Sequence, residues 1–162
     1  ELGIYPIRTH IPYWNDLKSY VSHYRTSRMS LLGTFNIGAT GLVAQSIRLN
    51  TTASNLANAD SVSGPDGKPY RSRQVVFTAT QQPGSPGNGV AVTEIIESAA
   101  PLRREYKPGH PKADSFGYVD MPNVNPTEEM VNMIGASRAY EANVQAINAT
   151  RAMWNKALEI GR

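Results

Sequence analysis

Apolar residues recur at alternating intervals of three and four over two long stretches, one in each half of the chain. The first stretch runs from Met29 to about Asn58, and the second from Pro126 to about Glu159. This spacing places apolar side chains along one side of an α-helix, at the a and d positions of a heptad repeat. We predict a long helix in each stretch, with a contact seam formed by Leu32, Phe35, Leu42, Leu49, Ala53, Leu56, Met130, Met133, Tyr140, Val144, Ile147, Trp154 and Leu158.

The second helix has clear start and stop signals. Asn125 is suited to the N-cap, Pro126 to the first helical position, and Glu128 to the acidic position of a capping box. Gly161 lies near the expected C-terminal end. At 1.5 Å per residue this helix is roughly 50 Å long.

A second stripe on the same helix consists of small residues at heptad spacing, namely Gly135, Ala139, Ala142, Ala146 and Ala149. A single alanine of this kind indicates only a good helix former on a solvated face. Five in register favour a second packed face, because small side chains let two backbones come close.

The centre of the chain is typical of β-structure. Two runs rich in β-branched residues, 71–80 and 89–98, predict a hairpin whose long Pro/Gly loop is tipped by Asn88 and Gly89. Short extended pieces follow between residues 102 and 122. The predicted fold class is α+β, with the terminal helices pairing as an antiparallel coiled coil around a small hairpin-rich insert. The corresponding segments are a 29–58 helix, a 59–122 insert and a 123–162 helix.

Residues 1–28 differ in composition from the rest of the chain. They contain four of the eight tyrosines and one of the two tryptophans, with Pro6 and Pro12 between them. We interpret them as an extension outside the core protein; the alternative is an aromatic arm that docks on a partner.

Charge and motif content exclude several function classes. The net charge is only +3 and the basic residues are dispersed, so nucleic-acid binding is not predicted. Cysteine is absent, and no nucleotide-binding, zinc-protease or serine-hydrolase motif occurs, so we predict no enzyme activity, cofactor, metal or small-molecule substrate. No apolar run is long enough to insert into a membrane. Arg103, Arg104 and Lys107 form a local basic cluster that either bridges subunits or solvates a loop.

The segment RLNTTASNLANAD, residues 48–60, has a thin apolar face of Leu49, Ala53 and Leu56 among Asn, Thr and Ser. Such a helix gains little from packing within one monomer. We interpret Asn55 and Asn58 as polar contacts between subunits, or as residues that close the helix end.

The same segment carries a family resemblance. SNLAN, followed by ADSVSGPDGKPYRSRQVVF, resembles the bacterial flagellar basal-body rod family, and in particular its C-type proximal rod branch. MPNV, EM and ASRAYEANV in the second helix are similar to the C-terminal motif of that family. The resemblance covers about residues 29–162. Trp154 departs from it, because the family more often has Met or Leu near that position.

The resemblance implies a structural subunit that polymerises through its terminal helices into the drive shaft transmitting torque from the rotor ring to the hook. It implies self-association, other rod and rod-adaptor proteins as partners, and export across the inner membrane by the type III apparatus without a cleaved signal peptide. The expected location is the periplasm-spanning rod of the basal body. The alternative is a soluble coiled-coil adaptor module with a β insert.

Overall fold

The computed structural model describes residues 31–64, 66–81 and 87–160, and the side chains of Leu31 and Leu32 lie outside the described part. Within these ranges the chain forms two long helices and four strands, which confirms the predicted α+β class. In chain order the elements are α2 (Leu31–Ala57), β1 (Arg73–Gln81), β2 (Asn88–Glu97), β3 (Arg103–Tyr106), β4 (Tyr118–Met121) and α3 (Pro126–Ile160). Residues 1–28, interpreted above as an extension, fall outside the described residues.

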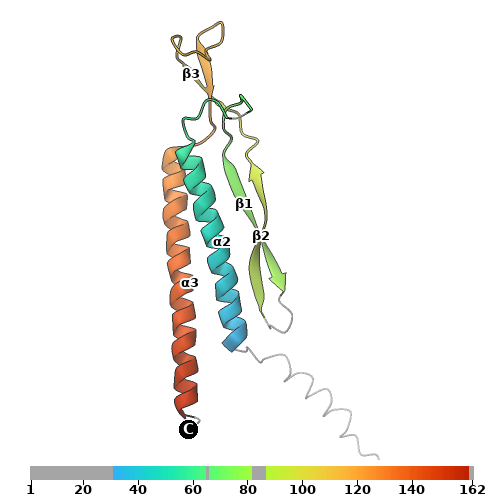
Figure 1. Cartoon of the computed structure of the whole chain (residues 1–162), viewed down its shortest axis with the longest axis vertical. Coiled ribbons are helices and arrows are strands. Elements are labelled where there is room, and N and C mark those ends of the chain that lie inside the picture. Colours follow the sequence, from blue (N-terminus) through green and yellow to red (C-terminus); the bar gives the residue numbers. More distant parts are fainter. Residues whose placement is uncertain (1–30, 65, 82–86, 161–162) are drawn as a thin grey trace, which may run out of the picture.

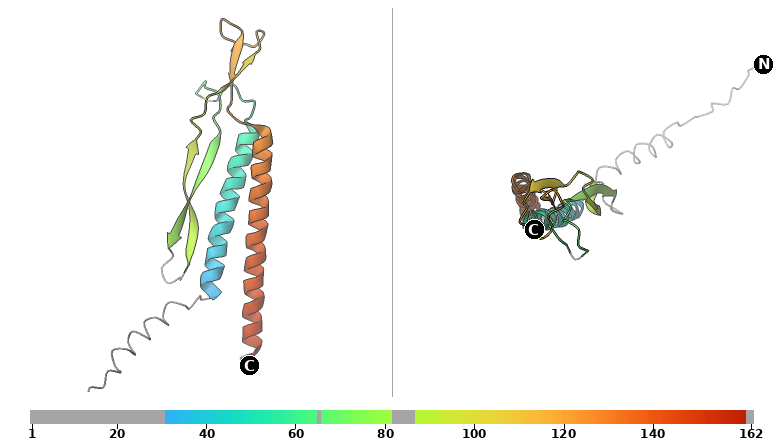
Figure 2. Two further views of the ribbon diagram at one scale, coloured as in Figure 1. Left: turned by 180° about the vertical axis from the view of Figure 1, so that it is seen from behind. Right: turned by 90° about the horizontal axis from the view of Figure 1, so that it is seen from above.

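The two helices run side by side in opposite directions (Figures 1 and 2). Glycines in α2 allow the close approach. A Cβ atom on Gly38 would lie 2.8 Å from Cγ1 of Ile147, and one on Gly41 would lie 2.9 Å from Nδ2 of Asn143. Any larger side chain at these positions would force Ile147 or Asn143 to move. The glycines that weaken α2 as an isolated helix therefore serve its packing.

The β1–β2 hairpin lies along α2 on the side away from α3, so that α2 is the middle layer (Figure 2, left). The pairing is antiparallel, with a register shift between Val76 and Phe77. β2 approaches α2 closely at Thr40, whose Oγ1 accepts a hydrogen bond of 3.2 Å from the Val90 N–H.

One feature of this hairpin corrects the sequence prediction. Asn88 and Gly89 do not tip the loop: they belong to β2 and pair with Gln81 and Thr80. Gly89 is buried, and a Cβ there would lie 2.9 Å from Oγ1 of Thr40. The glycine is needed for contact with the helix, whereas the prediction assigned it to turn formation.

Strands β3 and β4 form a second antiparallel hairpin, which projects beyond the end of the helix pair (Figure 1). Its loop returns through Gly117, which has a φ of +81° that favours glycine. The start of α3 follows directly. The Asn125 Oδ1 accepts a hydrogen bond of 3.1 Å from the Thr127 N–H, which confirms the predicted N-cap.

The buried apolar side chains are few and mostly small. Within the described residues they are Ala44, Ala59, Val119, Met121, Pro122, Val124 and Ala136. Five of these seven lie in or next to β4 or just after α2, where the helices and the hairpins meet. Most of the length of the molecule is therefore built from thin layers with little interior.

Candidate assembly surfaces

The predicted seam of α2 is only partly covered. Leu42, Leu49 and Leu56 are half-buried, Phe35 is 43% exposed, and Ala53 is exposed. The side chain of Leu32 lies outside the described residues. The residues that α2 buries most deeply toward its C-terminal end are instead polar: Thr51, Thr52 and Asn55.

On α3 the buried line is displaced by one residue from the predicted one. Met133, Val144 and Ile147 are half-buried, but Met130, Tyr140, Trp154 and Leu158 are exposed. The buried residues of this helix, Glu129, Ala136 and Thr150, share a heptad register with Asn143, which contacts Gly41. The prediction was based on large apolar side chains. Because the two helices lie close together, the side chains buried between them are small or hydrogen-bonded. Thr150, for example, donates to the carbonyl of Ala146 at 2.9 Å.

The second predicted face of α3 lies largely at the surface. Gly135, Ala142, Ala146 and Ala149 are exposed, and Ala139 is half-buried. A Cβ atom added to Gly135 would have nothing within 4 Å. Most of the stripe is therefore at the surface, with open space next to Gly135. A role in subunit packing stays a prediction.

Asn55, by contrast, is fully used inside the chain. Asn55 is only 1% exposed, and its side-chain amide bonds both backbone groups of Arg73. Oδ1 accepts a hydrogen bond from the Arg73 N–H at 2.9 Å, and Nδ2 donates one to the Arg73 carbonyl at 2.8 Å. The hydroxyl of Tyr70 donates to the same Oδ1 at 2.9 Å. The side chain thus replaces a neighbouring strand at the start of β1.

Asn58 closes the end of α2, which is one of the two roles expected for it. Its Nδ2 donates to the Ser54 carbonyl at 2.8 Å, and its Oδ1 accepts from the Ser61 hydroxyl at 3.1 Å. These contacts satisfy backbone and side-chain groups at the helix terminus. The structure therefore gives both asparagines of the NLAN segment intrachain partners.

Asn123, which sequence reasoning did not single out, supplies a second amide at the same place. Its Oδ1 accepts from the Ser72 N–H at 2.8 Å, and its Nδ2 donates to the Ala100 carbonyl at 2.9 Å. We call the network of Asn55, Tyr70, Ser72, Arg73 and Asn123 the amide junction. It ties the end of α2, the start of β1 and the approach to α3 together. The hydrogen-bond partners are 15 to 51 residues apart, so they leave no periodic signal in the sequence.

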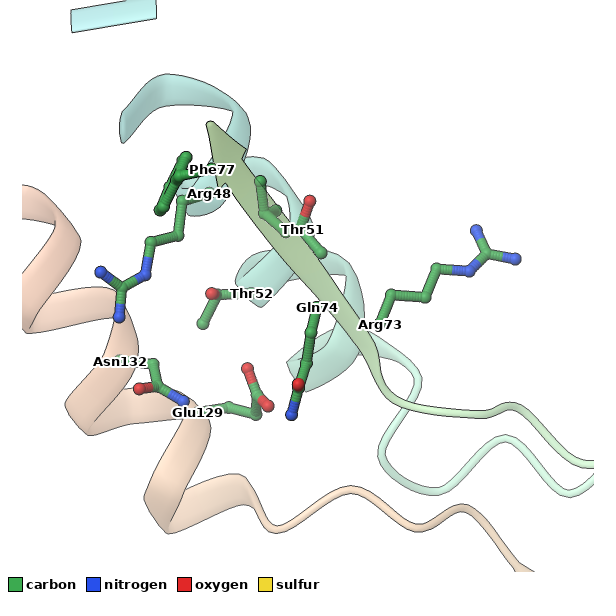
Figure 3. A pocket seen from close by; sticks show the side chains of 9 residues that line it. Arg48, Thr51, Thr52, Arg73, Gln74, Phe77, Glu129 and Asn132 are labelled. Atoms are coloured by element: carbon green, nitrogen blue, oxygen red, sulfur yellow. The ribbon is translucent and has the colours of Figure 1, made fainter. Parts of the chain in front are cut away.

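A cleft of about 370 Å³ opens next to the amide junction, between α2, β1 and α3. Figure 3 shows the carboxylate of Glu129 pointing from α3 into this space, with Thr52 of α2 opposite. The other polar lining groups include Arg48, Gln74 and Asn132. Phe77 provides an apolar wall, whereas Arg73 points away from the cleft (Figure 3).

The basic cluster on β3 is paired with acids of the same chain. Arg104 contacts Asp114 at 2.6 Å and Asp120 at 3.2 Å, and Lys107 contacts Glu105 at 3.2 Å. Arg103 lies 3.8 Å from Asp60. These ion pairs lie within the chain, and whether the cluster also bridges subunits stays a prediction.

The described residues contain no group of three or more His, Asp or Glu side chains placed to hold a metal ion. None of the described helices is long and apolar enough to cross a membrane.

Sequence comparisons show similarity to flagellar basal-body rod proteins. Residues 35–65 match a family described as flagella basal body rod protein, and residues 117–160 match the C-terminal family of the flagellar basal body rod FlgEFG proteins. The chain is 55% identical to the flagellar basal-body rod protein FlgC of Yersinia enterocolitica over 134 residues, which are 83% of this chain and 100% of that protein. It is 53% identical to FlgC of Salmonella typhimurium over the same shares. Identity to FlgC of Borreliella burgdorferi is 40%, over 82% of this chain and 98% of that protein.

Proposed function

Because this chain belongs to the flagellar basal-body rod protein family, we propose that it polymerises through its paired helices into the proximal rod, which transmits torque from the rotor ring to the hook. Its family makes it a structural, non-enzymatic subunit of the basal-body rod, which assembles with other rod proteins. The proposal adds three points to this family role: the position in the proximal rod, the helical contacts that build the polymer, and the transmission of torque.

The observation that carries this proposal is the surface left over on α3. One side of the helix packs on α2, but most of the small-residue stripe and the apolar residues Met130, Val131 and Ile134 are exposed. Exposed apolar surface of this extent on a helix favours contact with another protein. Small residues at heptad spacing favour a close helix neighbour, as they do between α2 and α3. We therefore infer a coiled-coil-like pairing within the subunit and further helix packing between subunits.

Substitutions on the two sides of the helix pair test this function. Ala146→Trp adds a large side chain on the exposed stripe, and Leu49→Asp places a charge on the half-buried side of α2. Each is expected to abolish swimming in a strain whose own rod gene is deleted, while the protein is still made. Ala146→Ser is the matched control, because it keeps a small side chain and should swim normally. Normal swimming with both Ala146→Trp and Leu49→Asp would refute assembly through these helices.

The export route is also part of the proposal. We infer passage through the type III apparatus without removal of a signal peptide, with the rod and rod-adaptor proteins as partners in the periplasm. Mass spectrometry of the protein from isolated basal bodies tests this. A peptide that begins at the translation start supports the proposal, and an internal, peptidase-type N-terminus contradicts it.

A further inference from the structure

The two strands of the β1–β2 hairpin bury almost none of their residues. Gly89 is the one buried residue in β1 and β2, and the others are exposed or half-buried. A two-stranded hairpin by itself is only marginally stable in water. The hairpin therefore depends on its attachments to α2, which it follows from the C-terminal end of that helix toward the first turns (Figure 1).

Two attachments of unequal strength hold the hairpin to α2. At the start of β1, the buried amide of Asn55 bonds both backbone groups of Arg73, at 2.8 and 2.9 Å. Near the far end of the hairpin, the Val90 N–H donates to the Thr40 hydroxyl at 3.2 Å in an exposed place. Among the described residues this is the one hydrogen bond between the hairpin and the first half of α2. Because water competes for an exposed bond, the second attachment releases more easily than the first.

Open space separates the hairpin from α2 between these attachments. One cleft of about 370 Å³ lies beside Thr52 and Phe77, and another of about 430 Å³ lies beside Ser54 and Ile95 (Figure 3 shows the first). Both clefts have room for several waters and are lined in part by polar side chains of α2. Release of the far end of the hairpin therefore exposes little additional apolar surface to water.

The weaker attachment lies on the part of α2 with the lowest helix propensity. Residues 33–41 include three glycines, which make poor helix formers. We call residues 87–90 the tip of the hairpin. A Cβ atom on Gly87 would lie 2.6 Å from Cδ1 of Ile37, and one on Gly89 would lie 2.9 Å from Oγ1 of Thr40. The tip thus packs closely on these glycine-rich turns.

One turn of α2 is held from two sides. The Thr40 hydroxyl donates to the Ile37 carbonyl of the same helix at 2.8 Å while it accepts from the Val90 N–H of the tip. On the other side, Gly38 and Gly41 lie against side chains of α3. If the tip leaves, this weak helical segment is held by α3 alone.

We propose that the β1–β2 hairpin is a strap, fixed at the amide junction and releasable at its tip, whose closure keeps residues 33–44 of α2 helical. The strap acts within one copy of the chain, so the inference goes beyond the role in assembly. Glycine-rich backbone gains more freedom than other sequences when it leaves the helix, which favours local opening once the tip is released. The two halves of α2 therefore open separately, the first with the tip and the second with the junction.

Amide hydrogen exchange of the dilute full chain tests the strap from the hairpin side. Gly89→Val places a side chain against Thr40 without altering α2, and should speed exchange at residues 33–44 by about fivefold or more. Exchange at residues 51–57 should stay unchanged. The matched control is Gly109→Val, which adds the same side chain where nothing lies within 4 Å of a Cβ atom. Equal acceleration of both halves of α2, or of neither, would overturn the proposal.

Thr40→Val tests the same contact from the helix side. It keeps the branched shape of the side chain but removes the hydroxyl that accepts from Val90. Exchange should therefore speed up by about fivefold at residues 33–44 and at the Val90 amide together. Thr40→Ser keeps the hydroxyl and should leave both close to their values in the unaltered chain. Acceleration in α2 with an unchanged Val90 amide would show an effect confined to the helix, which contradicts the strap.

A disulfide that locks the tip should produce the opposite change. A Cβ atom on Gly89 would lie 3.5 Å from Cβ of Thr40, which is within the span of a disulfide, and the chain has no cysteine of its own. The oxidised double variant Thr40→Cys, Gly89→Cys should exchange about tenfold more slowly at residues 33–44 than its reduced form. Exchange at residues 51–57 should be the same in both forms.

Two results of the locking experiment would overturn the strap. One is failure of the two cysteines to join under mild oxidation, because the closed tip holds them within bonding distance. The other is equal exchange at residues 33–44 in the oxidised and reduced forms. Since the dilute chain is measured, either result decides on the strap whether or not the chain builds rods.

Discussion

The amide junction and the β3–β4 hairpin are neighbours, and both are held by polar contacts, but the two networks differ in burial and in charge. The junction is bonded through neutral groups, with Arg73 contributing only its backbone, and its central Asn55 is 1% exposed. The hairpin uses ion pairs such as Arg104–Asp114, whose side chains are 59% and 33% exposed. Water competes for the exposed contacts and cannot reach the buried ones. Burial therefore decides how much a polar contact contributes to stability.

The largest expected effect comes from breaking the junction at Asn55. Asn55→Ala leaves the N–H and carbonyl of Arg73 and the hydroxyl of Tyr70 without their partner. Because these groups face a mostly buried site, we expect a loss of about 2–4 kcal/mol in the free energy of unfolding. Denaturant titration measures it. Asn50→Ala, at an exposed position of the same helix, is the control and should change stability by less than about 0.5 kcal/mol. Similar values for the two variants would show that the junction is not a stabilising element.

A smaller loss of stability is expected from breaking the close contact between α2 and α3. Gly38→Leu forces a side chain toward Ile147, where a Cβ alone would already lie at 2.8 Å, and should cost about 1–3 kcal/mol of unfolding free energy. Gly135→Leu is the same change on α3 where nothing lies within 4 Å, and should stabilise the monomer by up to about 1 kcal/mol through helix propensity. Thermal unfolding of both variants gives the comparison. Equal destabilisation by the two substitutions would contradict the close contact at Gly38.

The smallest effect is expected in the exposed hairpin, as a dependence on pH. Hydrogen bonds from the backbone N–H groups of Tyr118 and Phe116, together with Arg104, lower the pKa of Asp114 below its usual 3.8. A lowered pKa in the folded state stabilises the hairpin above pH 3.8, and this contribution is lost as the pH falls through the lowered value. The amide resonances of Tyr118 and Phe116 should therefore titrate below pH 3.8. Asp114→Asn should remove the titration, and a midpoint at or above 3.8 in the unaltered protein would contradict the contact.

Hydrophobic spacing and capping chemistry predicted the elements well. The two helices, the N-cap at Asn125 and the first hairpin follow from local patterns, because capping, helix periodicity and strand alternation depend on residues a few positions apart. The buried register of α3 could not be predicted in the same way. The prediction placed the large apolar side chains of α3 in the helix contact. Gly38 and Gly41 bring the two helices so close that the smaller Ala136 and Thr150 are buried there instead.

The segment RLNTTASNLANAD shows most clearly how the two levels differ. Its sequence determined that a helix with a thin apolar face ends near residue 58, and its motif pointed to the rod family. Only the tertiary structure decided what the polar side chains do. Asn55 meets Arg73 across 18 residues and Ser72 meets Asn123 across 51, so their hydrogen bonds depend on how distant segments are brought together. A polar residue in a sequence carries the capacity to donate and accept, but the folded chain determines its partner and how far water is excluded from the bond.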